Sequence, residues 1–276
     1  FIGLGYKVFN NLSVGANFSY LYGDITHQSM TTIGATDTRS IKLDKFSISD
    51  YKLDFGLQYT YKLNKKNTIN IGAVYTLGRT LHGDAYKYHQ TGTESNGSIY
   101  VQSQTGDTIP NPFKMPHTFG IGLTYVYDNR LTIGVDYTLQ KWNTADLAWS
   151  KFNKESVEMN SRTKIAFGAE FVPSYISHNY LKRIRYRMGA YYSSPYNKVS
   201  YTSPDTGTTS FQDGAREYGV SIGFGLPMFQ SKSMLNISGQ YIKVSPKFKG
   251  LMEENYLRIN IGLTFNERWF MKWKVD

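Results

Sequence analysis

The sequence predicts an all-β protein, a transmembrane antiparallel up-and-down β-barrel. Three observations predict this fold. Apolar and polar residues alternate with a period of two, which gives a strand one apolar and one polar face. This pattern recurs eleven times without a helical segment, and short connections alternate with long ones along the chain. Residues 131–139, LTIGVDYTL, show the alternation most clearly.

The composition excludes several other classes of protein. The 276 residues include no cysteine, so disulfide frameworks and thiolate metal sites are excluded. Mean hydropathy is negative, and no apolar run approaches the roughly 20 residues of a membrane-spanning helix. Barrel strands escape that test because half of each strand faces a polar lumen. Aromatic residues make up 16% of the chain, and 23 of them are tyrosines.

The net charge of +10 does not indicate a nucleic-acid partner. Lysine and arginine are spread over turns and strands, and no RNA-binding or helix-turn-helix pattern accompanies them. We therefore expect no nucleic-acid partner. A strand buried in a membrane implies instead a lipid bilayer, with lipopolysaccharide, as the surroundings.

Five strands are expected in the first half of the chain. Asn10-Asn11 is expected to form a tight turn, because Asn tolerates positive φ at low cost. Polar loops are expected at residues 25–39 and 82–116, and the second is the longest. The third strand is long, as a tilted strand protruding from a membrane would be. The five strands cover residues 1–9, 12–24, 51–61, 69–77 and 119–127.

Six more strands follow. A short turn at Asp128-Asn129-Arg130 precedes the first, and a loop with Trp142 and Trp149 follows it. The strands cover residues 131–139, 165–171, 183–192, 218–226, 235–241 and 257–265.

The connections predict which strand ends share a rim. Short turns near residues 10, 65, 129, 178 and 230 alternate with long loops near 32, 98, 152, 206 and 250. Outer-membrane barrels place short turns on the periplasmic rim and have an even number of strands. Eleven strands therefore predict an odd number of further strands upstream. We expect residues 1–266 to be the C-terminal part of a longer barrel and residues 267–276 a periplasmic extension.

The polar face of the strands is rich in glycine rather than in lysine and glutamate. Gly5, Gly15, Gly56, Gly72 and Gly122 are examples. Glycine in a strand marks a bend, a bulge or the close approach of another backbone. A lumen narrowed by an inserted plug and plain strand curvature both explain this pattern. A soluble sandwich or propeller fits the loop asymmetry less well.

Two hairpins resemble a known family. Residues 114–125, KMPHTFGIGLTY, and the following 128–137, DNRLTIGVDY, are similar to the proline-led hairpin of the FadL/TodX/OmpP1 outer-membrane transport family. Residues 3–8 with 12–16 resemble an earlier hairpin of that family. The ending 262–270, GLTFNERWF, resembles Bacteroidetes members.

The resemblance implies a 14-stranded barrel in the outer membrane of a Gram-negative bacterium, of which 11 strands are visible here. It also implies an N-terminal hatch that plugs the lumen and passive uptake of hydrophobic small molecules, such as long-chain fatty acids. Bacteroidetes barrels of this type also act as accessory members of larger complexes for secretion or barrel assembly. The alternative function is therefore a non-conducting role with outer-membrane protein or lipoprotein partners. The 82–116 loop is mostly polar, which keeps this alternative open.

Charged residues on the strands are the candidate lumen-facing site. Arg183, Arg185 and Arg187 are expected to form a basic row on one face of one strand. Such a row fits a substrate carboxylate or an acidic plug. It fits a ladder of ion pairs with neighbouring acids better, because unpaired charges rarely persist in a confined lumen. The other candidates are Glu170, Asp136, Glu217 and Arg258.

No metal site, cofactor site or catalytic site is expected. His82, Asp84 and His89 share one loop, but their spacing matches no standard metal site. No Ser/His/Asp set or carboxylate pair stands in a defined relation. Function must be argued from a site, and an enzyme is therefore not expected.

Overall fold

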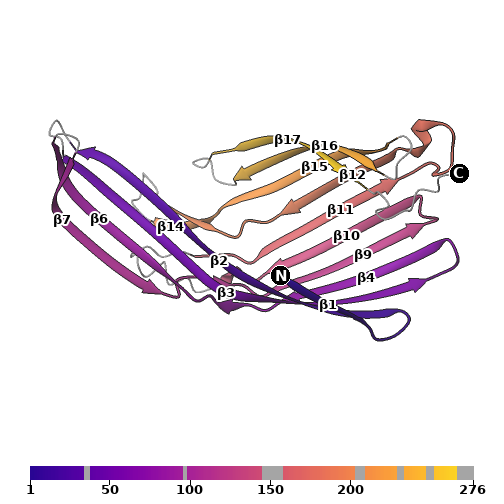
Figure 1. Ribbon diagram of the computed structural model, residues 1–276, viewed down its shortest axis with the longest axis horizontal. Coiled ribbons are helices and arrows are strands. Elements are labelled where there is room, and N and C mark those ends of the chain that lie inside the picture. The colour runs from indigo at the N-terminus through magenta and orange to yellow at the C-terminus, as the bar shows by residue number, and fades with distance from the viewer. Residues whose placement is uncertain are drawn as a thin grey trace, which may run out of the picture.

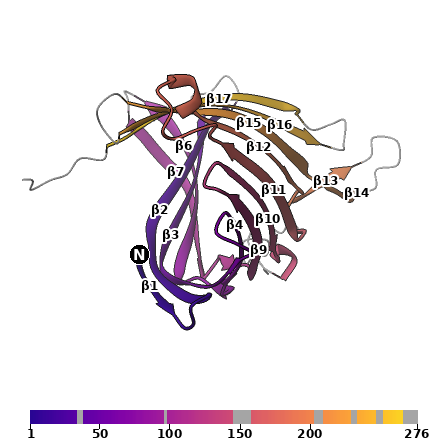
Figure 2. The same cartoon turned by 90° about the vertical axis from the view of Figure 1, so that its right-hand side faces the viewer.

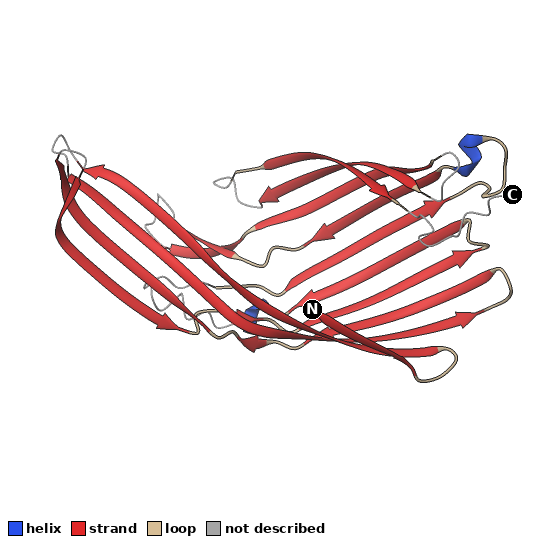
Figure 3. Cartoon of the chain, in the orientation of Figure 1, coloured by secondary structure: helices blue, strands red, loops and turns tan. Residues whose placement is uncertain are grey.

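The structure is a computed structural model that describes residues 1–33, 38–95, 98–144, 158–202, 209–228, 233–246 and 252–265. Strands make up nearly all of it (Figure 3). The predicted extension 267–276 and Trp149 lie outside the described residues. In the described ranges, no helix is long and apolar enough to cross a membrane.

Eleven strands form one continuous antiparallel sheet in chain order, as predicted (Figure 1). The sheet, here called the wall, curls strongly from β1 and β2 through β9 and β10 to β17 (Figure 2). β1 and β17 are its two edges, and no ladder joins them in the described residues. The strands are β1 (Ile2–Lys7), β2 (Leu12–Ile33), β3 (Thr38–Lys62), β4 (Asn67–Thr76), β9 (Thr118–Tyr127), β10 (Leu131–Gln140), β11 (Arg162–Phe171), β12 (Arg185–Ser193), β15 (Ala215–Pro227), β16 (Met234–Pro246) and β17 (Glu254–Thr264).

The two rims of the wall differ as predicted from the connection lengths. The short-turn rim carries the β3–β4 and β9–β10 turns, and the opposite rim carries the long connections. Asp128 and Asn129 both have positive φ, as the two central residues of a type I′ turn do, and the N–H of Arg130 closes this turn by donating to the carbonyl of Tyr127 at 2.8 Å. Asn10 and Asn11 also lie in a turn, but neither has positive φ. The reason given for that turn was therefore wrong.

Strands form in two regions that were predicted to be polar loops. β2 and β3 remain paired through residues 21–33 and 38–50, which include most of the polar loop expected at residues 25–39. β6 (Gly83–Ser95) and β7 (Ser98–Pro110) form a hairpin that fills most of the expected 82–116 loop, and β6 pairs with β3. We call these four paired segments the blade. They project far beyond the wall (Figure 1). Polar residues form strands here because each backbone finds a neighbour for its hydrogen bonds.

Short elements complete the chain. β5 (Arg79–Thr80) pairs with β8 (Lys114–Met115) and ties the base of the β6–β7 hairpin. β13 (Lys198–Thr202) and β14 (Thr209–Asp213) form a separate hairpin between β12 and β15. Two 3₁₀ turns, η1 (Trp142–Thr144) and η2 (Tyr180–Arg183), lie in the β10–β11 and β11–β12 connections.

The apolar side chains of the wall are exposed on its outer face. Its middle band is mostly aliphatic, as at Ile121, Val220 and Ile222, which are 56–62% exposed. Both ends of this band carry aromatic residues. At the short-turn rim these are Tyr61, Tyr127, Phe171, Tyr186 and Phe224, here called the short-turn girdle; at the other rim they are Tyr51, Phe119, Tyr137, Tyr218 and Tyr241. A large apolar surface of this kind requires a non-aqueous partner.

Asp50 lies where β3 leaves β4 and begins to pair with β6. The side chain is buried and accepts hydrogen bonds from the backbone N–H of Tyr51 at 2.6 Å and of His82 at 2.8 Å. Arg79 forms an ion pair with it at 3.3 Å, and the same guanidinium lies 3.8 Å from the centre of the Tyr51 ring. The carboxylate thus joins β3 to the start of the β6–β7 hairpin.

The hydrogen bonds change the pKa of Asp50. Burial raises it, but the two backbone N–H donors, the His82 side chain and Arg79 lower it, and the net pKa lies below the ordinary value. A carboxyl group with a lowered pKa stabilises the folded state above its unfolded pKa, about 3.9. That stabilisation is lost as the pH falls through the folded pKa.

We predict that Asp50→Asn opens the base of the β6–β7 hairpin. The amide keeps the size of the carboxylate but loses its charge and one acceptor oxygen, a change of about 1–3 kcal/mol for a buried group. Hydrogen exchange of β6 amides at pH 7 should therefore be about 5- to 150-fold faster. The difference from the unmodified protein should be constant between about pH 5 and 8 and shrink below about pH 3.9.

The control for this variant is Asp84→Asn in the same hairpin. The Asp84 side chain accepts a long hydrogen bond, 3.4 Å, from the Tyr86 hydroxyl. Equal exchange rates in the two variants would show that Asp50 does not hold the hairpin.

Candidate functional site

Glycines form an open hollow on the inner face of the wall. Gly5, Gly15 and Gly56 face one another in neighbouring strands of the ladder. Gly72 and Gly122 pair in the next row, across β4 and β9. Since these positions lack side chains, a hollow of about 570 Å³ lies over β1–β4, β9 and β10. We call it the glycine hollow.

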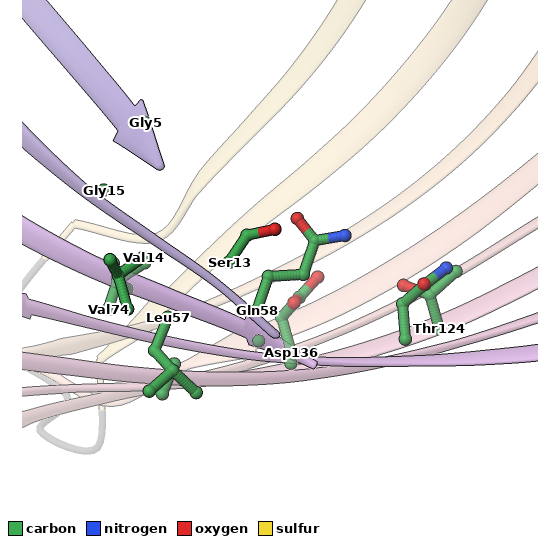
Figure 4. A pocket seen from close by; sticks show the side chains of 14 residues that line it. Gly5, Ser13, Val14, Gly15, Leu57, Gln58, Val74, Thr124 and Asp136 are labelled. Carbon is green, nitrogen blue, oxygen red and sulfur yellow. The ribbon is translucent and has the colours of Figure 1, made fainter. Parts of the chain in front are cut away.

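Polar side chains border the glycine hollow. Ser13, Gln58, Thr124 and Asp136 point to the side over which the later strands curve, whereas Leu57 points away from it (Figure 4). The two faces of the strands thus separate as the alternating sequence predicts. A hollow of this size is large enough for a small ligand or a chain segment.

An ion-pair cluster lies on the β11, β12 and β16 part of the wall. Glu170 accepts hydrogen bonds from Arg185 at 2.9 Å and from Arg187 at 2.7 Å. Arg187 also donates to the side-chain oxygen of Asn236 at 2.7 Å. All three charged side chains are half-buried. The prediction that arginines of this strand pair with neighbouring acids is confirmed for Arg185 and Arg187.

A second polar cluster lies nearer the long-connection rim. Glu217 accepts a hydrogen bond from the Tyr191 hydroxyl at 2.5 Å. Arg162 approaches Glu217 to 3.9 Å and donates to Ser193 at 2.7 Å. This cluster joins β11, β12 and β15, so its contacts cross three strands.

Three of the remaining predicted residues lie apart from the Glu170 cluster. Arg183 belongs to η2, so the expected row of three arginines on one strand is wrong. Asn179 accepts a hydrogen bond from the N–H of Leu181 at 3.0 Å and starts this 3₁₀ turn, which delays the strand until Arg185. Asp136 borders the glycine hollow, and Arg258 faces Gln240 in the β16–β17 ladder.

Several residues of these clusters were not singled out in the sequence. The strand register determines which residues lie opposite each other across the sheet. It brings Arg162, Tyr191 and Asn236 to their hydrogen-bond partners. The loop residues His82, Asp84 and His89 contact different partners, namely Asp50, Tyr86 and Ser40. No group of three metal-ligating side chains occurs in the part of the chain that the structure describes.

The comparison with family models decides the family. The BamG family model matches residues 1–276. This chain belongs to the BamG family. No curated protein matches the BamG-family chain.

Two solved structures share the fold of the BamG-family chain. The first is a FadL homologue of Pseudomonas aeruginosa, with a TM-score of 0.54 and 14% identity, over 89% of this chain and 58% of that one. The BamG-family chain therefore spans less than two thirds of that relative's length. The second is a TodX deltaS2S3 mutant, described as a monoaromatic hydrocarbon channel, with a TM-score of 0.50 and 13% identity, over 94% of this chain and 67% of that one.

These findings refine the expected family. The FadL/TodX resemblance is confirmed for the fold, while the family that matches the BamG-family chain is BamG. The assignment to Bacteroidetes stays a prediction, and so do the 14 strands and the lumen-facing roles of the charged residues.

We predict that Glu170→Gln destabilises the wall of the BamG-family chain. The change leaves the guanidinium groups of Arg185 and Arg187 facing each other without a counter-charge. Because both groups are partly exposed, we expect a loss of about 1–2 kcal/mol in the free energy of unfolding. Urea unfolding of the detergent-solubilised protein measures it.

The matched control is Glu158→Gln, which removes the exposed pair with Lys198 at 2.7 Å. An exposed pair contributes about 0–1 kcal/mol. If both variants unfold at the same urea concentration, the Glu170 cluster does not stabilise the wall.

Proposed function

We propose that this protein is an outer-membrane barrel that acts as a non-conducting accessory member of a barrel-assembly machine. The observation that carries the proposal is the match of the BamG model to the whole chain, residues 1–276, since the name BamG points to such a machine. The exposed aliphatic band between two aromatic girdles supports an outer-membrane location, because barrels of that membrane have this surface.

The blade supports a role in protein contact rather than in capture of hydrophobic molecules. Uptake needs an apolar groove at the outer rim, whereas β6 and β7 are largely polar. One blade face does carry exposed side chains of the types enriched at protein interfaces, namely Tyr22, Met30, Tyr86 and Tyr88, which are 38–79% exposed. The partner expected on this face is another outer-membrane protein or a lipoprotein.

Purification of the tagged full-length protein from solubilised outer membranes tests this role. We expect a larger barrel or lipoproteins to co-purify at a constant ratio, with a native mass above that of the protein alone. Tyr22→Lys with Tyr86→Lys should reduce the co-purified partner about tenfold or more, because tyrosines often dominate interface energy. Lysine adds a charge that the partner does not compensate.

The control variant carries Ser103→Lys and Thr105→Lys, which place two lysines on the opposite face of the same hairpin. Equal loss in both variants would indicate general damage to the blade. A single barrel with no partner in the unmodified protein would overturn the proposed function.

Uptake of hydrophobic molecules is the second candidate function. The glycine hollow favours it, since its volume of about 570 Å³ lies within the range of ligand sites. If the protein conducts, Arg187→Ala should reduce uptake of a labelled long-chain fatty acid several-fold, because the change removes a partly exposed guanidinium that would bind the carboxylate of the fatty acid. Arg183→Ala, outside the strand, is the control. Unchanged uptake in Arg187→Ala removes the anion-binding role.

A further inference from the structure

The connection between β11 and β12 is longer than the β3–β4 and β9–β10 turns of the same rim. It spans residues 172–184 and includes η2. The N–H of Ser174 donates to the carbonyl of Lys182 at 2.8 Å, and that of Lys182 to the carbonyl of Asn179 at 3.2 Å. These bonds fold the connection back on itself. It is therefore an ordered projection, here called the η2 turn.

The η2 turn exposes apolar side chains from this ordered frame. Ile176 is 92% exposed and Leu181 is 63% exposed. Burying either side chain against an apolar partner would be favourable. The same turn contains His178, Lys182 and Arg183 and no aspartate or glutamate. Its surface therefore combines apolar side chains with positive charge, which fits an anionic partner with an apolar part.

A hydrogen bond places η2 beside the outer face of the wall. The hydroxyl of Tyr186 donates to the carbonyl of Leu181 at 3.0 Å. Tyr186 belongs to the short-turn girdle, and its ring meets that of Phe224 edge-on at 5.9 Å. Figure 3 shows η2 at the end of the wall, past the strands. The exposed Leu181 thus lies just beyond the aromatic end of the apolar band.

We propose that the η2 turn binds the membrane surface. Leu181 and Ile176 enter the boundary between headgroups and acyl chains, and Lys182 and Arg183 bind the phosphate of an anionic phospholipid. This proposal rests on the outer-membrane location in the proposed function. The position of the η2 turn next to the short-turn girdle agrees with this proposal, because aromatic girdles lie at the level of the lipid headgroups. Basic residues next to such a girdle are well placed for lipid phosphates.

Labels at single cysteines test the depth, since the chain has no cysteine of its own. Full-length protein with Leu181→Cys or Ile176→Cys is spin-labelled in liposomes that contain phosphatidylglycerol. Collisions with oxygen and with a water-soluble nickel complex are then compared. At both sites we expect the ratio of oxygen collisions to nickel collisions to lie between the ratios of two control positions. Ile222→Cys marks the middle of the outer apolar band, and Lys65→Cys marks the β3–β4 turn.

The controls separate the two proposals. If the label at Ile222→Cys collides with the nickel complex as often as a label in water, the membrane location is wrong. If Ile222→Cys reports lipid while positions 176 and 181 are as open to the nickel complex as Lys65→Cys, only the η2 proposal is overturned. Shielding of positions 176 and 181 from both reagents would indicate a protein cover and would overturn it as well.

Native mass spectrometry tests the headgroup contact. Lys182→Gln with Arg183→Gln should retain phosphatidylglycerol several-fold less than the unmodified protein. The matched control, Lys65→Gln with Lys66→Gln, removes two charges from another turn of the same rim. Equal retention in the two variants, or equal binding of phosphatidylethanolamine and phosphatidylglycerol by the unmodified protein, would overturn the phosphate contact.

Discussion

The structure depends on one constraint, that the backbone of each strand finds its hydrogen-bond partners on neighbouring strands. In a membrane there is no water to replace a missing partner, so wall strands must pair along their full length. β4, β9, β10, β11 and β12 have 9 or 10 residues each, and ladders join each of them to both neighbours. This pairing fixes the register, and the register decides which side chains meet. Glu170 faces Arg187 because Gly168 faces Gly189 two residues away.

The same constraint explains how the wall passes into the blade. β3 has 25 residues and exchanges one partner for another along its length, β4 near the short-turn rim and β6 beyond Asp50. At the exchange point the backbone N–H of His82 has no ladder partner on β4, and the Asp50 carboxylate accepts its hydrogen bond. A buried carboxylate needs several donors, and Tyr51, His82 and Arg79 supply them. A small polar cluster thus joins the blade to the wall, next to the buried side chains of Leu81 and Ala85.

The alternation of apolar and polar residues was sufficient to predict the eleven wall strands and their two rims. It failed at residues 25–39 and 82–116, because the strands of the blade are rich in polar residues and their composition resembles that of a loop. It failed again at Arg183, where the pattern of Ile184 and Tyr186 was extended across a 3₁₀ turn. Glu170, Arg185 and Arg187 of the Glu170 cluster could be predicted, since the arginines alternate on one strand and the acid lies in the neighbouring one. Asn236 and Arg162 could not, because only the register brings them to their partners.

Charge balance also limits which parts of the molecule can attract a partner. On the inner face, Glu170 lies between Arg185 and Arg187, and Glu217 lies near Arg162, so much of the positive charge there is compensated within the wall. In the η2 turn, Lys182 and Arg183 have no acidic neighbour in sequence. The blade presents exposed tyrosines on one face, next to charged side chains such as Lys45. The two surfaces proposed to bind partners, the η2 turn and the blade, lie at opposite ends of the molecule (Figure 1).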